Sequence, residues 1–102
     1  MTEDIKDNII TIIKNIPKGY VTSYGRIASM AGIPRSARYI VYILKTETSH
    51  HNLPWHRVVN SRLQIAIKNP IGQNEQMQLL RSEGIPVDQE GKITKEYLWM
   101  PY

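Results

Sequence analysis

The feature that most constrains the fold is a tight corner between two short helical stretches in the first half of the sequence. Ser23 can cap a helix over residues 24–31, and Gly32 follows where helices often end in left-handed backbone. Pro34 can open the next helix, because a missing N–H costs little in a first turn. The apolar residues of that helix share one face: Ala37, Ile40, Val41 and Leu44. Two short helices joined in this way predict a helix-turn-helix, a pattern that alone leaves the function open.

Isoleucines recur at helical spacing near the N-terminus and predict a first helix over residues 3–16. Pro17 and Gly19 follow at once and end it. Offsets of four, seven, eight and eleven from the first isoleucine place all of them on one face. The isoleucines of this predicted buried face are Ile5, Ile9, Ile12, Ile13 and Ile16.

The second half of the chain predicts a loop, a strand, a helix and a tail. Residues 46–53 are polar and read as a loop, and residues 54–59 as a partly extended stretch. Leu63, Ile65 and Ile67 alternate as in a short strand, and residues 73–83 have helical spacing that stops at Gly84. A small hairpin is expected around Gly91. The side chains expected to dock the tail are Trp99, Met100 and Tyr102.

The length of 102 residues allows one domain with a modest core. The expected fold class is therefore α+β and mainly helical, a winged-helix-like helix-turn-helix domain over residues 1–102. We expect it to act as a monomer.

Charge is distributed unevenly along the chain. Residues 24–68 hold seven basic residues against Glu47 as the one acid, while the rest of the chain is slightly acidic. A basic middle between acidic ends suggests a surface for a polyanion, with nucleic acid the first candidate. A solvated surface that happens to be basic explains the charge almost equally well.

The composition excludes several classes of function. None of the residues is cysteine, which removes disulfides, thiolate zinc sites and thiol catalysis. No run of about 18 apolar residues exists, so we expect no membrane span. The first residues are acidic, unlike a secretory signal, so we expect a cytoplasmic protein, associated with the nucleoid if the source is prokaryotic. No cofactor or metal is expected.

Four segments, in order, resemble the C-terminal active-site domain of the O6-alkylguanine-DNA alkyltransferases. The resemblance spans about residues 3–86, and its most specific part is the Pro-x-His-Arg-Val segment at residues 54–58. The other segments are weaker alone, but their order and spacing make an accident improbable. The four segments cover residues 19–24, 31–38, 54–58 and 79–84.

The chain departs from those enzymes at position 55. The enzymes have cysteine there, and its thiolate attacks the alkyl carbon on guanine O6. Trp55 offers no comparable lone pair, since its N–H only donates. The hinge asparagine of the enzymes would fall on Glu47. The sequence therefore resembles the alkyltransferase-like branch of the family, which is not enzymatic. That resemblance implies binding of O6-alkylguanine in double-stranded DNA by minor-groove docking and nucleotide flipping, and hand-over of the lesion to nucleotide excision repair proteins.

The resemblance also assigns a DNA-binding face on a recognition helix over residues 34–45. Arg38 matches the family arginine that fills the gap left by the flipped nucleotide, a task that suits a flat cation. Tyr24 matches the tyrosine that rotates the 3′ phosphate and contacts the base. Arg35, Ser36 and Ala37 are expected to contribute charge or backbone N–H contacts to phosphates. The alternatives are a surface arginine that binds phosphate and a tyrosine that merely packs.

Trp55 is expected to line the pocket that receives the flipped base. A large aromatic offers π surface to a base, with stacking worth about 1–3 kcal/mol. Alternatively, Trp55 simply fills the space of the lost thiol as core packing. The sequence leaves these two interpretations nearly even, and both can hold together.

Five further residues belong to the predicted lesion pocket. His56 and Glu83 match the pair that activates the enzymes' cysteine, and here we expect them to form a buried hydrogen-bond network. Arg57 is expected to support the same turn, and Val58 to offer backbone groups to the guanine edge. Lys68 corresponds to a basic residue that faces the pocket in non-enzymatic relatives.

Two other functions remain open at this stage. The first is a general winged-helix-like DNA-binding protein without lesion specificity, but the presence of Tyr24 and Arg38 favours a base-flipping protein. The second is a different enzyme, such as a hydrolase, that reuses His56 and Glu83. No second nucleophile or metal-ligand cluster supports it, since His50 and His51 are neighbours in the predicted loop.

Overall fold

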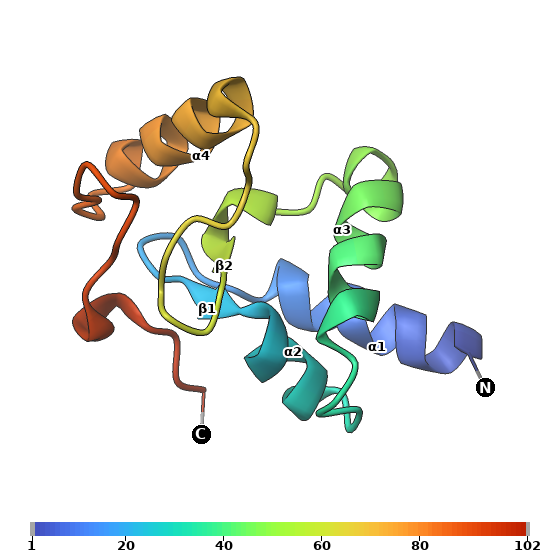
Figure 1. The fold of residues 1–102 in the computed structure, drawn as a ribbon. Coiled ribbons are helices and arrows are strands. Elements are labelled where there is room, and N and C mark those ends of the chain that lie inside the picture. The colour runs from blue at the N-terminus through green and yellow to red at the C-terminus, as the bar shows by residue number, and fades with distance from the viewer. Residues whose placement is uncertain (1, 102) are drawn as a thin grey trace.

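The computed structural model describes residues 2–101, with side chains from residue 4 onward (Figure 1). It is mainly helical with one small sheet, which confirms the predicted fold class. The helices are α1 (Thr2–Lys14), α2 (Tyr24–Met30), α3 (Ala37–His51) and α4 (Pro70–Ser82), with short 3-10 turns η1 (Trp55–Arg57) and η2 (Lys95–Tyr97). The strands are β1 (Thr22–Ser23) and β2 (Val58–Val59).

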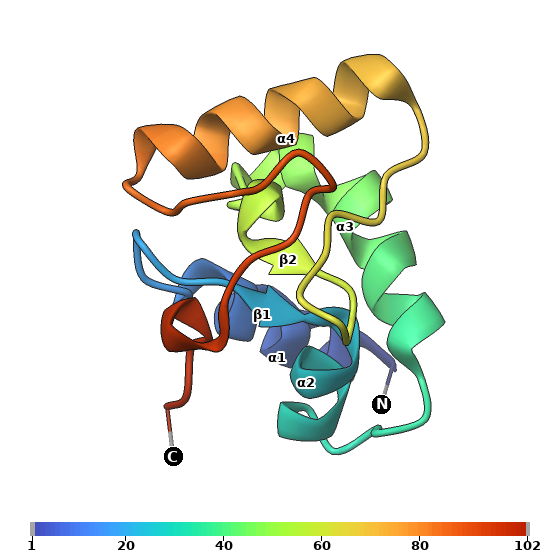
Figure 2. The same cartoon turned by 60° about the vertical axis from the view of Figure 1, so that its left-hand side comes forward.

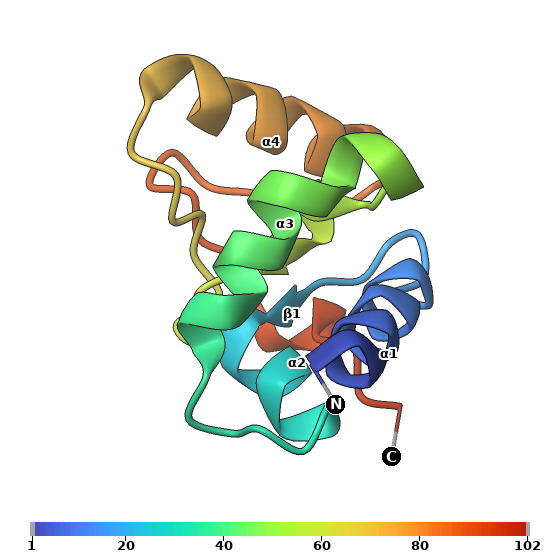
Figure 3. The same ribbon diagram turned by 90° about the vertical axis from the view of Figure 1, so that its right-hand side faces the viewer.

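The sheet lies between two groups of helices. Figure 2 shows α4 on one side of β1 and β2 and helices α1 and α2 on the other, and Figure 3 shows α3 beside them. The strands are parallel, with Thr22 opposite Val58. The C-terminal tail extends this sheet. The Trp99 N–H donates to the Val21 carbonyl at 2.7 Å, and Val21 and Leu98 form a parallel β-bridge.

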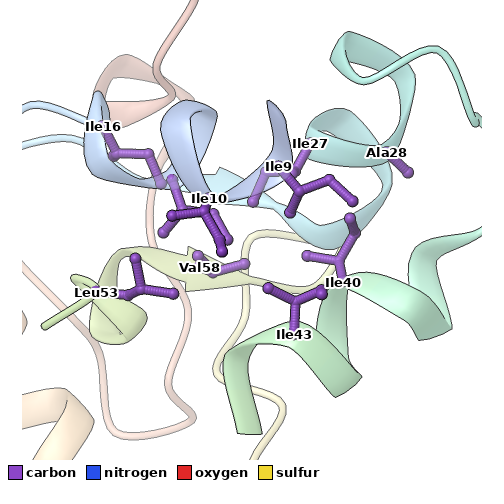
Figure 4. Packing of buried hydrophobic residues seen from close by; sticks show 10 residues of the cluster. Ile9, Ile10, Ile16, Ile27, Ala28, Ile40, Ile43, Leu53 and Val58 are labelled. Carbon is purple, nitrogen blue, oxygen red and sulfur yellow. The ribbon is translucent and has the colours of Figure 1, made fainter. Parts of the chain in front are cut away.

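The larger core cluster joins α1, α2, α3 and the segment that leads into β2. Ile9, Ile13 and Ile16 are buried as predicted, while Ile5 and Ile12 pack at its margin. Ile10 was not predicted to be inside, yet it is 5% exposed. Figure 4 shows the α1 and α2 side chains facing Ile40, Ile43 and Val58 across the core. This packing holds the two helices of the helix-turn-helix against α1.

A second core cluster lies beneath α4 and the tail. Its buried members include Leu80 of α4, Val21, Val59, Ile85 and Ile93. Trp99 packs against the first cluster, but Met100 is 64% exposed, so its predicted docking was wrong. Tyr102 lies outside the described residues. Residues 88–92 form the predicted turn, in which Gly91 has a φ of +80°.

The helix-turn-helix is confirmed, although its second helix starts later than predicted. Ser23 caps α2 by accepting a hydrogen bond from the Arg26 N–H, and Gly32 has a φ of +81°. Pro34 does not open α3. Residues 34–36 form a turn in which the Ser36 N–H donates to the Ile33 carbonyl at 2.9 Å. The recognition helix therefore begins at Ala37 rather than at residue 34.

The predicted loop over residues 46–53 was wrong, because α3 continues to His51. Glu47 lies on this extension, forms an ion pair with Lys6 of α1 at 3.0 Å and lies 3.4 Å from His51 Nε2. The hydroxyl of Thr48 donates to the Leu44 carbonyl. Asn52 then ends the helix in left-handed backbone, with a φ of 51°. A contact with α1 and local side-chain bonds thus keep a polar stretch helical.

Two further boundaries differ from the predictions. Leu63 has a φ of 58°, which breaks the predicted strand over residues 63–67, although the Ile65 N–H still donates to the Gly91 carbonyl at 2.9 Å. Helix α4 begins at Pro70 rather than at residue 73, because the Asn69 side chain accepts hydrogen bonds from the first helical N–H groups. Gly84 follows α4 with a φ of +85°, as predicted. Within residues 2–101, no helix is long and apolar enough to cross a membrane.

The burial pattern predicts unequal costs for two isoleucine substitutions. Ile13→Ala removes a fully buried side chain and should lower the free energy of unfolding by about 2–5 kcal/mol, measured by urea denaturation. The control Ile71→Ala changes a side chain that is 81% exposed and should shift stability by no more than about 0.5 kcal/mol. Equal effects would mean that the α1 core is not packed as described.

Candidate DNA-binding face and lesion pocket

The predicted DNA-binding residues lie together at the start of α3. Arg35 is exposed in the turn before the helix, and Arg38 is exposed in its first turn. Ser36 occupies the N-cap position but makes no side-chain capping bond. Ala37, as the first helical residue, has an N–H that the helix itself cannot use. This end of α3 therefore offers two exposed cations and a hydroxyl that makes no capping bond.

Tyr24 connects that surface to a pocket. It is the first residue of α2 and is half-buried, and this burial raises the pKa of its phenol above the usual value. Like any phenol at neutral pH, its hydroxyl is protonated and can both donate and accept a hydrogen bond.

The pocket has a volume of about 320 Å³ and lies between α2, α3 and α4. Three predicted residues come together on its wall: Tyr24, Trp55 and Val58. The indole of Trp55 also meets the His56 ring edge-on, with ring centroids 6.2 Å apart. Trp55 is therefore both a pocket wall and a packing group. The other lining residues, which sequence reasoning missed, are Val41, Leu44, Lys45, Thr48, Ile67 and Gln76.

Four of the missed residues come from one face of α3. Val41, Leu44, Lys45 and Thr48 follow the i, i+3, i+4 and i+7 spacing of a single helical stripe. The same spacing in the sequence could have indicated them, had the helix been predicted to reach Thr48. Lys45 is the one charged residue among the described residues on this wall.

His56, Arg57 and Glu83 form the predicted hydrogen-bond network, which is partly rather than fully buried and does not line that pocket. The Glu83 carboxylate lies 2.6 Å from His56 Nε2 and accepts hydrogen bonds from Arg57 Nη2 at 2.8 Å and Nε at 3.0 Å. It also accepts from the Gly19 N–H at 3.1 Å, and Arg57 Nη1 donates to the Ile16 carbonyl at 2.8 Å. The network thus joins the chain after α1, the η1 turn and the end of α4.

The electrostatics of this network keep Glu83 ionised. Burial alone would raise the pKa of the Glu83 carboxyl. The hydrogen bonds from Arg57, His56 and the Gly19 N–H outweigh burial and hold that pKa at about 2, against an ordinary value of 4.5.

Lys68 was expected to face the pocket, and Val58 was expected to offer backbone groups to the guanine edge. The structure places both differently. Lys68 is exposed in the loop before Asn69 and is not among the residues that line the pocket. The Val58 carbonyl is already engaged, because Gln76 Nε2 donates to it at 3.0 Å. Among the described residues, no group of three or more His, Asp or Glu side chains could hold a metal ion.

A helix-turn-helix with exposed arginines beside an aromatic-walled pocket defines a DNA-binding domain. The family model for the 6-O-methylguanine DNA methyltransferase, DNA binding domain, matches residues 4–85. This chain belongs to that family, as its four segments predicted.

Two relatives match over nearly their whole length. The chain is 43% identical over 94 residues to a DNA base-flipping protein of Vibrio parahaemolyticus, covering 91% of this chain and 93% of that protein. It is 32% identical to alkyltransferase-like protein 1 of Schizosaccharomyces pombe, over 97% of each. The crystal structure of S. pombe Atl1 in complex with damaged DNA containing O6-carboxymethylguanine superimposes with a TM-score of 0.87, at 32% identity and over 97% of both chains.

The Glu83 network predicts an acid-sensitive contribution to stability. The folded-state pKa of about 2 lies below 4.5, so the ionised carboxylate stabilises the fold fully above pH 4.5 and ceases to do so as the pH falls through about 2. Glu83→Gln should therefore lower the free energy of unfolding at neutral pH by roughly 1–3 kcal/mol. It should also flatten the dependence of that free energy on pH between 4.5 and about 2, as measured by urea titrations.

Glu75→Gln is the matched control, because Glu75 is exposed on α4 and the charge change is the same. A Glu83→Gln protein with the wild-type pH profile would show that the network contributes no acid-sensitive stability.

Proposed function

We propose that this protein binds O6-alkylguanine in double-stranded DNA by taking the flipped base into the pocket of Trp55, without removing the alkyl group. The observation that carries the proposal is the placement of Tyr24 and Trp55 on one pocket wall, next to the helix that bears the exposed Arg38. The relatives named for base flipping, and the fold shared with a protein bound to damaged DNA, support the same function.

The energetics of flipping suit this pocket. Extruding a base costs a few kcal/mol and is cheapest for a poorly paired base, such as an O6-alkylguanine. Stacking on an aromatic side chain returns about 1–3 kcal/mol. The wall is otherwise mostly apolar, through Val41, Leu44 and Ile67, which suits an alkyl group. An alkylated base therefore gains more here than a well-paired guanine does.

DNA docking is assigned to the start of α3 in the minor groove. Arg38 fills the gap left by the flipped nucleotide, and Tyr24 acts on the 3′ phosphate. Arg35, Ser36 and Ala37 position the phosphates through charge and polar groups. Because the Ser36 side chain makes no capping hydrogen bond, its hydroxyl is available for this role.

The absence of alkyl transfer follows from chemistry. Trp55 stands at the position where the family's enzymes need a thiolate, and none of the residues is cysteine. His56 and Glu83 then have no thiol to activate. We assign them to the network that positions η1.

A protein that binds a lesion without repairing it must pass the lesion on. We therefore propose that the complex marks the site for nucleotide excision repair proteins, within the cytoplasm or on the nucleoid. Lys68, near the start of α4, remains a proposed contact to the lesion, made once DNA is bound.

A general DNA-binding function is the second candidate, favoured by the basic groups on α3 alone. Fluorescence anisotropy with duplexes that do or do not contain one O6-methylguanine separates the two candidates. We expect at least about tenfold tighter binding to the lesion, about 1.4 kcal/mol, with protein and DNA masses unchanged. Equal affinities would favour the general binder. Loss of the methyl group from the DNA would instead reveal an enzyme.

The gap-filling role predicts different outcomes for two neighbouring arginines. Arg38→Ala should weaken lesion binding by about 1–3 kcal/mol and reduce the preference for the lesion. The control Arg35→Ala should weaken binding to both duplexes by one factor and lower the salt slope by about 1, through loss of a phosphate contact. If the two variants behave alike, Arg38 is only a phosphate contact.

A further inference from the structure

The outward face of α3 carries a large aromatic side chain that is mostly exposed. Tyr42 is 58% exposed, although most of a tyrosine side chain is an apolar ring. It lies about one turn after Arg38 and one turn before Lys45, both exposed, so the three side chains are neighbours on the helix surface. In the proposed function, this is the face that docks in the minor groove. An aromatic residue exposed alone needs no explanation, but one at the centre of a binding face indicates a contact.

Tyr39 supports the ring of Tyr42 from the side of the core. The two rings stack, with centroids 6.2 Å apart and planes inclined by 14°. Tyr39 is itself half-buried and packs against the core cluster that joins α1, α2 and α3. The exposed ring is thus held by a second ring that the core holds in turn. Pressing it against a ligand therefore costs less side-chain entropy than ordering a free surface residue.

Tyr42 and the pocket lie on opposite flanks of α3. The line that joins Arg38 to Lys45 runs along the outward face of the helix. At about 3.6 residues per turn, Val41 and Thr48 fall on the pocket side of that line, and Tyr42 falls on the other side. A helix that lies in the minor groove has one DNA strand along each flank. The pocket flank faces the strand that gives up its base, so Tyr42 faces the complementary strand.

On the basis of the proposed function, we infer that Tyr42 packs its ring against the deoxyriboses of the complementary strand, beside the gap that Arg38 fills. Deoxyriboses present C–H groups at the edge of the minor groove, and a flat aromatic ring covers such groups well. Contacts to sugars fix the position of the protein and carry no sequence information. Tyr42 therefore holds the strand opposite the lesion, and it contributes to the affinity for any duplex rather than to the preference for the lesion.

Hydroxyl-radical footprinting tests this contact, because the radicals cut DNA at exposed deoxyriboses. A duplex with one O6-methylguanine is labelled on either strand and saturated with protein. Tyr42→Ala should lose the protection of the complementary strand opposite the lesion and keep the protection of the lesion strand. In fluorescence anisotropy, the same variant should bind duplexes with and without O6-methylguanine about tenfold more weakly, so that the ratio of the two affinities is unchanged.

Two further variants serve as controls. Tyr42→Phe keeps the ring and should retain the wild-type footprint and affinity. Tyr20→Ala removes the same kind of side chain, which is 43% exposed but lies before β1 rather than on α3, and it should change neither measurement. Thermal unfolding checks that each variant folds.

Unchanged protection of the complementary strand in Tyr42→Ala overturns the inference. So does a loss confined to the lesion strand, and so does a loss on both strands, because Tyr42 would then only support α3. The proposed function is judged separately, by the wild-type affinities for the O6-methylguanine and guanine duplexes. Tighter binding to the lesion leaves that function standing whatever the footprint of Tyr42→Ala. Equal affinities would end it, and this inference with it.

Discussion

The partly buried carboxylate of Glu83 is the group on which the rest of the structure depends, because its hydrogen bonds join segments that are far apart in the chain. It binds the Gly19 N–H before β1, His56 and Arg57 in η1, and itself sits at the end of α4. Trp55 precedes His56 and Arg57 in the chain, and Val58 follows them. The network therefore positions these two residues of the pocket wall. A pair that activates a thiol in related enzymes therefore has a structural use that survives the loss of the thiol.

Local chemistry explains which parts of the fold could be predicted. The Ser23 cap, the left-handed Gly32 and the buried face of α1 each depend on residues within a few positions of one another. The extension of α3 depends instead on Glu47 meeting Lys6, a contact between distant segments that no local pattern reveals. The start of α4 was missed for another reason, since Asn69-Pro70 is a capping pair that resembles loop punctuation.

The residues of the candidate site also fall into those that the sequence predicted and those that only the packing of distant segments reveals. Tyr24, Trp55 and Val58 could be grouped because the family resemblance placed them, and the structure brings them to one pocket. Gln76 and Lys45 were missed because neither belongs to a motif, and their places on the pocket wall depend on the packing of α4 and α3 around that pocket. The two interpretations of Trp55 are compatible, since the same indole lines the pocket and packs against the His56 ring.

The length of α3 has a consequence for how docking and base reading are coupled. Its first turn bears Arg38, while Val41, Leu44, Lys45 and Thr48 follow on the pocket side. Had the helix stopped at residue 45, Thr48 would lie on a loop that moves independently of Arg38. Because one continuous helix carries both, Arg38 and the pocket wall are fixed relative to each other, and in the proposed function this fixes the gap-filling arginine relative to the pocket. A base can then be flipped into a pocket whose distance from the groove is set by the helix itself.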